Sequence, residues 1–197
     1  MSVPSVWCAG LTVLAVFAAS PVTAEPYRWL VAPGKSQVMF QAAFSLGNFS
    51  GQTTEVAGEL TADPADLRLP VTGVVRVNPG SLRTGIDGRD RDMRQALGVT
   101  RHPEIRFVVQ GVEASFPTMT DRSDVLLLVT GRMVINGVER SIAVPGRARL
   151  RDDRIWARGE TRLNMSDYGI APPRRLFVFR VADDITVSFD LDLVKAD

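Results

Sequence analysis

Strict alternation of apolar and polar residues near the C-terminus constrains the fold of this chain more than any other feature. From residue 185 to residue 193 every odd-numbered position is apolar, and the positions between them hold Thr, Ser or Asp. A helix would spread the apolar residues around its circumference, whereas a β-strand places all of them on one face. The segment is therefore predicted to be a strand with one buried face.

The same period of two recurs upstream, in segments separated by turn signals. It is found at residues 38–44, 71–77, 105–109, 127–135, 142–144 and 157–163. Asn136-Gly137 is a strong hairpin signal, and clusters of Gly, Pro and Asp, among them Gly47-Asn48 and Pro172-Pro173, stand between other segments. Only residues 89–97 have helical character. About eight strands with one short helix are therefore predicted.

An all-β chain of this kind forms a sandwich or a barrel. A barrel is favoured because closure removes exposed strand edges, and because eight strands leave room for one small ligand. An outer-membrane barrel does not fit, since the faces opposite the apolar residues carry Asp, Arg, Gln and Ser rather than a lipid-facing apolar band. We therefore expect an extended antiparallel β-barrel that is soluble.

The first 24 residues have the features of a secretory signal peptide. Residues 6–19 form an apolar run too short to span a bilayer comfortably, and Val22-Thr23-Ala24 fits a cleavage site. Removal of residues 1–24 would leave one exported domain, residues 25–197, in the periplasm or outside the cell, without a membrane span. No Lys or Arg precedes the apolar run, so an uncleaved anchor is the alternative.

Charge and rare residues exclude several classes of function. The chain has 23 Lys and Arg against 22 Asp and Glu, scattered along its length, so no basic surface for nucleic acid is expected. One His and one Cys exclude most zinc sites and any intramolecular disulfide. The nucleophile motifs G-x-S-x-G and S-x-x-K are absent from the sequence. We therefore expect no metal, no cofactor and no catalytic residue.

The inward face of the predicted barrel is almost wholly apolar. Gly73, Gly131 and Gly159 stand at inward positions, where small residues either ease a bend in the sheet or leave open volume. A filled core is the alternative to a cavity, but an open cavity would suit an apolar ligand, since each buried CH₂ contributes about 0.8 kcal/mol. The residues predicted to line such a pocket are Val38, Phe40, Phe44, Val75, Phe107, Val129, Met133, Leu163, Val187 and Phe189.

A series of short motifs runs in a fixed order from Tyr27 to Leu193. The motifs are Trp29, Ser36-x-x-x-Phe40, Phe49-Ser50-Gly51, Gly58-Glu59-Leu60 with Asp63-Pro64, Ser81-Leu82-x-Thr84-Gly85, Arg91-Asp92, His102-Pro103-x-Ile105-x-Phe107, Gly131-x-Met133-x-Ile135-Asn136-Gly137-Val138, Ser166-Asp167-Tyr168-Gly169-Ile170 and Val181-x-Asp183-Asp184-Ile185. In this order the chain resembles the YceI-like polyisoprenoid-binding family. The resemblance implies a lipocalin-like barrel, commonly periplasmic, whose central apolar pocket holds a long isoprenoid or another amphiphilic lipid.

Two positions depart from the pattern of that family. Where the family often has Asp-x-x-His-Ser, this chain has Ala32-x-x-Lys35-Ser36, and Met165 stands where an Arg is common. Lys35 can donate to a phosphate or a carbonyl oxygen, but unlike His it cannot accept a hydrogen bond. These departures bear on the identity of the ligand rather than on the fold.

We therefore expect a non-enzymatic binding protein, as a monomer or a homodimer, that holds an isoprenoid, a quinone-like molecule or a fatty amphiphile. Headgroup contacts are expected from Arg91, Asp92, His102 and Tyr168, although Arg91 and Asp92 equally fit an ion pair that fixes a loop. Two alternatives stay open. One is a lipid-modifying enzyme that uses His102 with Asp92 or Glu104 as an acid–base pair. The other is a secreted interaction module whose barrel is only a scaffold.

Overall fold

The computed structural model describes residues 26–171, 174–175 and 179–196, with side chains for all of these except 174, 175, 179 and 180. The predicted signal peptide and Pro172-Pro173 lie outside the described residues. The strands are β1 (Tyr27–Val31), β2 (Gln37–Phe44), β3 (Gly47–Thr53), β4 (Val56–Ala62), β5 (Thr72–Val77), β6 (Ile105–Ala114), β7 (Val125–Ile135), β8 (Val138–Arg151), β9 (Arg154–Asn164), β10 (Arg174–Arg175) and β11 (Phe179–Lys195). The helices among these residues are α1 (Asp87–Ala96) and two short 3₁₀ helices, η1 (Pro79–Ser81) and η2 (Met165–Tyr168).

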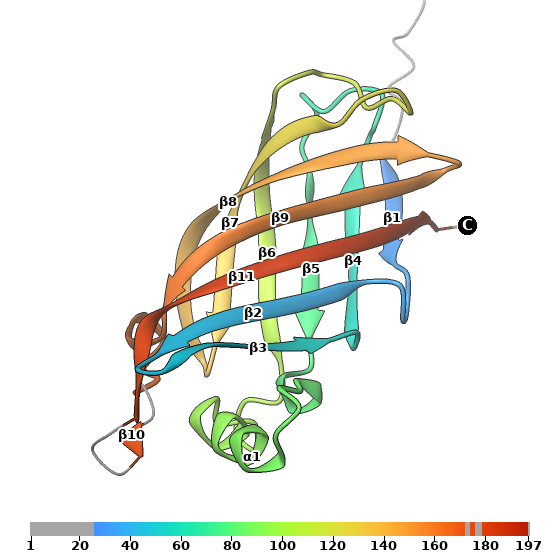
Figure 1. The fold of residues 1–197 in the computed structure, drawn as a ribbon. Helices are drawn as coiled ribbons and strands as arrows, with labels where there is room; N and C mark the ends of the chain where they lie inside the picture. Colours follow the sequence, from blue (N-terminus) through green and yellow to red (C-terminus); the bar gives the residue numbers. More distant parts are fainter. Residues whose placement is uncertain (1–25, 172–173, 176–178, 197) are drawn as a thin grey trace, which may run out of the picture.

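Eight of the strands close into an antiparallel barrel (Figure 1). Their order around the wall is β1, β4, β5, β6, β7, β8, β9 and β11, and β1 closes the circle by pairing with both β4 and β11. The closing ladder between β1 and β11 has three register pairs, from Trp29–Lys195 to Val31–Leu193. The predicted antiparallel barrel of about eight strands is therefore confirmed.

The β2–β3 hairpin extends this wall (Figure 1). β2 pairs with β11 from Phe44–Val181 to Gln37–Asp190, on the edge that β1 occupies farther along β11. β3 pairs with the other side of β2 and also forms an isolated bridge at Gln52, whose two backbone hydrogen bonds to Arg83 are each 3.0 Å long. One edge of β11 is thus shared between two neighbours.

Two of the inward glycines are covered by aromatic rings. Phe189 on β11 is the register partner of Gly159 on β9. A Cβ atom added at Gly159 would lie 2.7 Å from the Phe189 ring and 2.5 Å from the Pro145 carbonyl oxygen. Phe107 covers Gly131 in the same way, at 2.9 Å. These glycines let a ring approach the backbone of a neighbouring strand, and they do not themselves leave open volume.

Two of the predicted turns have different outcomes. The hairpin at Asn136-Gly137 is confirmed, with φ of 51° and 76° at the two turn residues, as a tight turn between twisted strands requires. The turn predicted at Gly47-Asn48 lies two residues earlier, at Ser45-Leu46, because Gly47 and Asn48 belong to β3 and pair with Phe44 and Ala43. Their composition is typical of turns, but pairing along β2 overrides it.

Helix α1 lies across one end of the barrel, here called the α1 end (Figure 1). It begins two residues before the predicted segment 89–97. Asp90 is buried, and its carboxylate accepts hydrogen bonds from the Thr84 hydroxyl at 2.5 Å and the Thr84 backbone N–H at 2.9 Å. The hydroxyl hydrogen bond is the main cause that holds the pKa of Asp90 below its ordinary value of 3.8. No described helix has the length and apolar character needed to cross a membrane.

The opposite end of the barrel, the far end, is closed by two loops that bind each other. The backbone N–H of Leu67 donates to the Pro117 carbonyl at 2.6 Å, and that of Met119 donates to the Pro64 carbonyl at 2.8 Å. The side chains of Leu67 and Met119 are buried in the main hydrophobic core. The barrel is therefore packed shut at the far end.

A buried polar cluster fixes the start of β2 against β11. Ser36 is fully buried, and its hydroxyl accepts a hydrogen bond from the Asp192 backbone N–H at 3.0 Å. The Asp192 carboxylate accepts two hydrogen bonds from the Arg154 guanidinium, at 2.9 and 2.6 Å. Arg154 thus satisfies the buried carboxylate. Because the Ser36 hydroxyl satisfies the buried Asp192 N–H, this motif residue has a structural role at this position.

Candidate functional site

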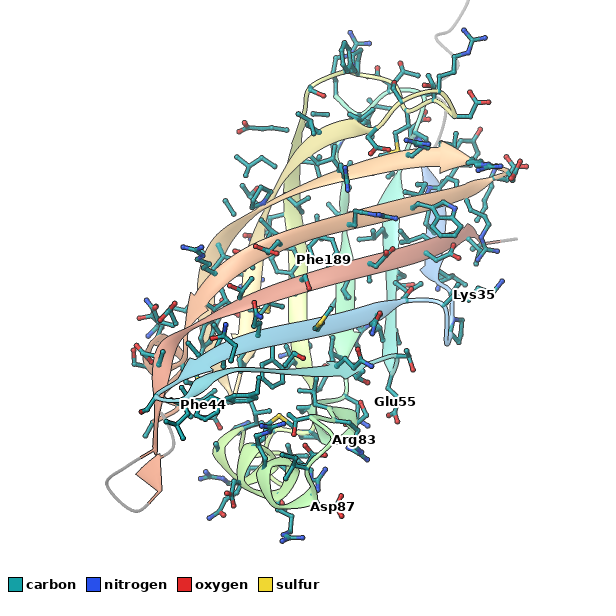
Figure 2. The ribbon with its side chains drawn as sticks, in the orientation of Figure 1. Lys35, Phe44, Glu55, Arg83, Asp87 and Phe189 are labelled. Carbon is teal, nitrogen blue, oxygen red and sulfur yellow. The ribbon has the colours of Figure 1, made fainter. Side chains whose placement is uncertain are left out.

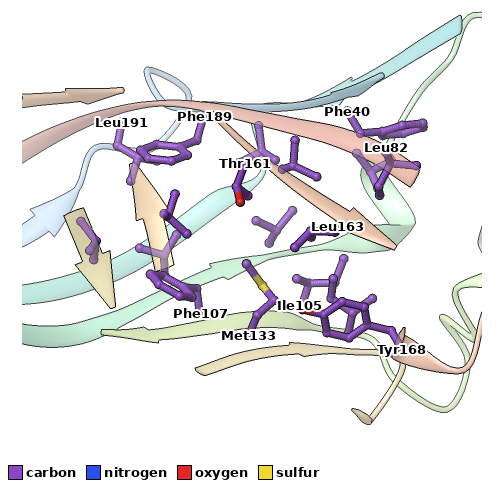
Figure 3. A pocket seen from close by; sticks show the side chains of 18 of the residues that line it. Phe40, Leu82, Ile105, Phe107, Met133, Thr161, Leu163, Tyr168, Phe189 and Leu191 are labelled. Atoms are coloured by element: carbon purple, nitrogen blue, oxygen red, sulfur yellow. The ribbon is translucent and has the colours of Figure 1, made fainter. Parts of the chain in front are cut away.

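The barrel encloses a cavity of about 580 Å³, within the range of roughly 300–1,000 Å³ that is typical of small-molecule sites. Its wall consists of inward-facing side chains of the barrel strands and of β2 and β3, and α1 lines it at the α1 end. Figure 3 shows part of this wall, with Phe107, Met133, Leu163 and Phe189 around the open space. The cavity is therefore an apolar compartment inside the barrel.

All ten residues predicted to line an apolar pocket lie on the wall of this cavity. They come from β2, β5, β6, β7, β9 and β11, so the antiparallel sheet brings together positions that are distant in the sequence. Their contact with a ligand stays a prediction.

Aromatic rings and an arginine line the α1 end of the cavity. The rings of Phe40 and Phe44 each lie 6.0 Å from the ring of Phe49, in edge-to-face arrangements. The Arg89 guanidinium lies 4.6 Å from the centre of the Phe49 ring, a cation–π contact between α1 and the β2–β3 hairpin. The alternation pattern does not reveal Phe49 or Arg89. The Phe49-Ser50-Gly51 motif is the sequence signal for the first of them.

The cavity wall carries few polar groups. Apart from the Trp29 indole, the described lining residues with polar side chains are Arg89, Asp92, Thr161, Asn164 and Tyr168. Arg89 donates to the hydroxyl and the carbonyl oxygen of Thr84, at 2.9 and 2.8 Å. The Asn164 amide donates to the Asp167 carboxylate at 3.2 Å. Arg89 and Asn164 are thus engaged by neighbouring residues, and Asp92 also has an interaction partner.

Tyr168 fills a gap in the barrel wall. The β8–β9 ladder ends at Gly146–Gly159, although both strands continue toward the α1 end, and η2 contacts both of them there. Tyr168 is 2% exposed, and its enclosed hydroxyl has no hydrogen-bond partner among the described residues. Burial, and secondly the negative charge of Asp167, raises the pKa of Tyr168 above its ordinary value of 10.0. The hydroxyl is therefore neutral at physiological pH, and the ring packs as part of the wall.

Of the four residues predicted to contact a headgroup, Asp92 and Tyr168 lie on the cavity wall and Arg91 and His102 do not. His102 lies in the loop after α1, and its imidazole packs against Gly137, where an added Cβ would lie 2.9 Å from Nδ1. This contact places His102 beside the β7–β8 turn.

Glu104 also lies away from the cavity wall. Its carboxylate forms ion pairs with the Nε atoms of Arg76 and Arg106, at 3.6 and 3.4 Å, and its side chain is 41% exposed. Arg76 and Arg106 alternate with inward-facing residues of β5 and β6, so these ion pairs lie on the outer face of the barrel. The acid–base pair of the enzyme alternative is therefore not assembled at the cavity.

The two positions that depart from the family pattern lie in different places. Lys35 is exposed in the turn before β2, and Figure 2 shows it at the opposite end of β2 from Phe44. Met165 begins η2 and lines the cavity. The first departure thus lies off the cavity, whereas the second adds an apolar side chain to its wall.

Comparisons with known proteins agree with this architecture. Residues 29–193 match the model of the YceI-like domain family. A polyisoprenoid binding domain from Saccharophagus degradans, implicated in plant cell wall breakdown, has 16% sequence identity and a TM-score of 0.70, over 85% of this chain and 98% of that chain. BcnA from Burkholderia cenocepacia has 16% identity and a TM-score of 0.68, over 82% and 98%. The YceI protein of Campylobacter jejuni has 17% identity and a TM-score of 0.60, over 75% and 84%.

None of the curated proteins matches the chain. The family match nevertheless runs from β1 to β11 and includes every strand of the closed barrel. The chain therefore belongs to the YceI-like domain family.

Proposed function

We propose that this chain is a lipid-binding protein whose barrel holds a long isoprenoid or another amphiphilic lipid. The observation that carries the proposal is the cavity of about 580 Å³, whose wall is made almost entirely of apolar side chains. Membership of the YceI-like domain family supports it, as does the fold shared with a domain described as polyisoprenoid binding. A quinone-like or fatty ligand fits the same physical argument.

Burial of a hydrocarbon chain would provide most of the binding free energy. Each CH₂ removed from water contributes about 0.8 kcal/mol, so ten buried carbon atoms contribute on the order of 8 kcal/mol. Ordering of a flexible chain and loss of its translational freedom offset part of this gain. A long chain with few polar atoms is therefore the class of ligand that gains most from this wall.

We assign binding rather than catalysis to the cavity. The charged side chains among the described lining residues are those of Asp92 and Arg89, and both belong to α1, at one end of the barrel. General acid–base catalysis needs two groups within reach of one reacting atom, and His102 and Glu104 lie off the wall. The proposed role is transport, storage or sequestration of the lipid, in the periplasm or outside the cell.

Native mass spectrometry of the mature protein, purified from the periplasm and followed by organic extraction, tests this proposal. The expected result is a stoichiometric adduct that survives desalting and is extracted as an isoprenoid or a long acyl lipid. The mass of the apoprotein alone, together with no uptake of offered isoprenoids or fatty amphiphiles, would contradict lipid binding. The same spectrum tests whether residues 1–24 are removed.

A pair of variants ties the adduct to the cavity. Val187 lines the cavity, and Ser188 is the next residue on the opposite face of β11. Val187→Trp places an indole in the cavity, whereas Ser188→Trp adds the same group to the outer face. With the β-sheet circular dichroism retained in both, we expect the first variant to lose the adduct and the second to keep it. Retention by both would show that the lipid binds elsewhere.

A further inference from the structure

A single threonine hydroxyl faces the open part of the apolar cavity. Thr161 lies on β9 and is the register partner of Val187 on β11. Both side chains line the cavity, and Figure 3 shows the Thr161 hydroxyl pointing into it between apolar neighbours. The residue is half-buried, and its hydroxyl has no hydrogen-bond partner among the described residues. An unpaired polar group therefore borders the space that a ligand would fill.

Thr161 differs from the other polar groups of the wall in its position. Arg89 and Asp92 belong to α1 at one end, and the Asn164 amide is bound to Asp167. The Tyr168 hydroxyl is enclosed by protein atoms, so a ligand in the cavity does not reach it. Thr161 therefore presents a hydrogen-bonding group to the interior.

The chemistry of threonine at position 161 favours a ligand with a polar atom over an entirely apolar ligand. Valine has nearly the same shape as threonine, so an entirely apolar ligand would be served equally well by valine, without an unpaired hydroxyl. A polar group enclosed by an apolar ligand loses its hydrogen bonds to water, which is unfavourable unless the ligand replaces them. A hydroxyl both donates and accepts, so it can pair with a hydroxyl, carbonyl or ether oxygen.

We propose that Thr161 hydrogen-bonds an uncharged oxygen of the bound lipid, so that this oxygen lies inside the barrel. The inference rests on the proposed function, because it needs a lipid in the cavity. It specifies the ligand class as a neutral, oxygen-bearing isoprenoid or similar lipid. A charged diphosphate does not suit this position, since a buried anion needs a cation close by and Arg89 lies at the α1 end, bound to Thr84. A pure hydrocarbon leaves the hydroxyl unpaired.

Two C20 compounds with the same branched skeleton test the proposal: the alcohol phytol and the alkane phytane. Their affinities are measured by displacement of an apolar fluorescent dye, with the wild-type protein, Thr161→Val and Thr161→Ser. The matched control is Thr186→Val, at a threonine of β11 that does not line the cavity. Geranylgeranyl diphosphate is the charged comparison.

We expect wild type to bind phytol more tightly than phytane, and Thr161→Val to lower the affinity for phytol by about 2- to 12-fold, the effect of one net hydrogen bond. The affinity for phytane should be unchanged or higher in Thr161→Val. Thr161→Ser should retain the preference for phytol, and Thr186→Val should match wild type. If the ratio of the affinities for phytol and phytane is the same in wild type and Thr161→Val, the role of Thr161 is overturned. Tighter binding of geranylgeranyl diphosphate than of phytol by wild type would overturn it as well. If neither C20 compound displaces the dye from wild type, the proposed function fails as well.

Discussion

Substitution of Gly159 by alanine tests whether the inward glycines leave volume or accommodate rings. The added methyl group would lie 2.7 Å from the Phe189 ring and 2.5 Å from the Pro145 carbonyl oxygen. The ring can rotate away, but the carbonyl belongs to the backbone of β8 and moves only with that strand. Overpacking of this kind costs about 1–3 kcal/mol. For a chain of this length, the melting temperature should therefore fall by about 2–12 °C.

Thermal and urea denaturation of the mature domain measure this effect. Gly88→Ala is the matched control, since a Cβ there meets only the end of the Arg91 side chain at 3.9 Å. Because alanine is the better helix former, the control should be neutral or stabilised by up to about 1 kcal/mol. In a Phe189→Leu background, Gly159→Ala should cost less than in wild type, because one of its two close contacts has been removed. Wild-type stability of Gly159→Ala would refute the reasoning and show that the space beside Gly159 is open.

Three further predictions concern polar groups of the barrel. Ser36→Ala should lower the free energy of unfolding in urea by about 1–3 kcal/mol, because the buried Asp192 N–H loses its acceptor; an unchanged urea midpoint would contradict this. The pKa of Asp90 is lowered in the folded protein, so its contribution to stability is full above pH 3.8 and is lost as the pH falls below that value. Asp90→Asn should therefore be less stable than wild type at neutral pH, with a gap that narrows in acid, and a constant gap would refute the assignment. Tyr168→Phe should melt at the wild-type temperature or above it, because it removes a buried hydroxyl without a described partner; a loss of several degrees would indicate a partner outside the described residues.

Much of the barrel is predictable from the alternation of apolar and polar residues alone. The strands that this pattern misses are missed for a physical reason. The segments around Val75, Phe107 and Val129 alternate because one face of each strand packs inside the barrel. β3 shows no such signal, since it contains Gly, Asn and Ser and is recruited by pairing with β2. The hairpin that contains β3 can join the sheet because β1 pairs with only part of one edge of β11 and leaves the rest to β2. The apolar period of a strand gives no information on which strands pair along its edges.

The cavity wall was predictable from the strands, and at the α1 end the sequence also indicated Asp92 and Tyr168 but not Arg89. Inward positions of regular strands follow the period of two, so residues such as Phe40 and Leu163 could be selected in advance. Arg89 could not, because its place beside Phe49 depends on how α1 packs across the barrel. Nor could the enclosure of Tyr168, which follows from the separation of β8 and β9 beyond Gly159.

One edge of β11 is shared between β1, which closes the barrel, and the β2–β3 hairpin, which forms part of the cavity wall. β1 completes the circle near the far end with three register pairs. On its β3 side, the contacts that tie the hairpin to the rest of the chain include the Gln52–Arg83 bridge, the Thr53–Ser81 hydrogen bond of 2.6 Å and the Arg89–Phe49 contact. Separation of the hairpin from η1 and α1 would disrupt these contacts, whereas separation of two barrel strands would break a ladder of three or more register pairs. A separation there would leave the circle of eight strands intact and would expose the part of the cavity wall formed by Phe40, Phe44 and Phe49.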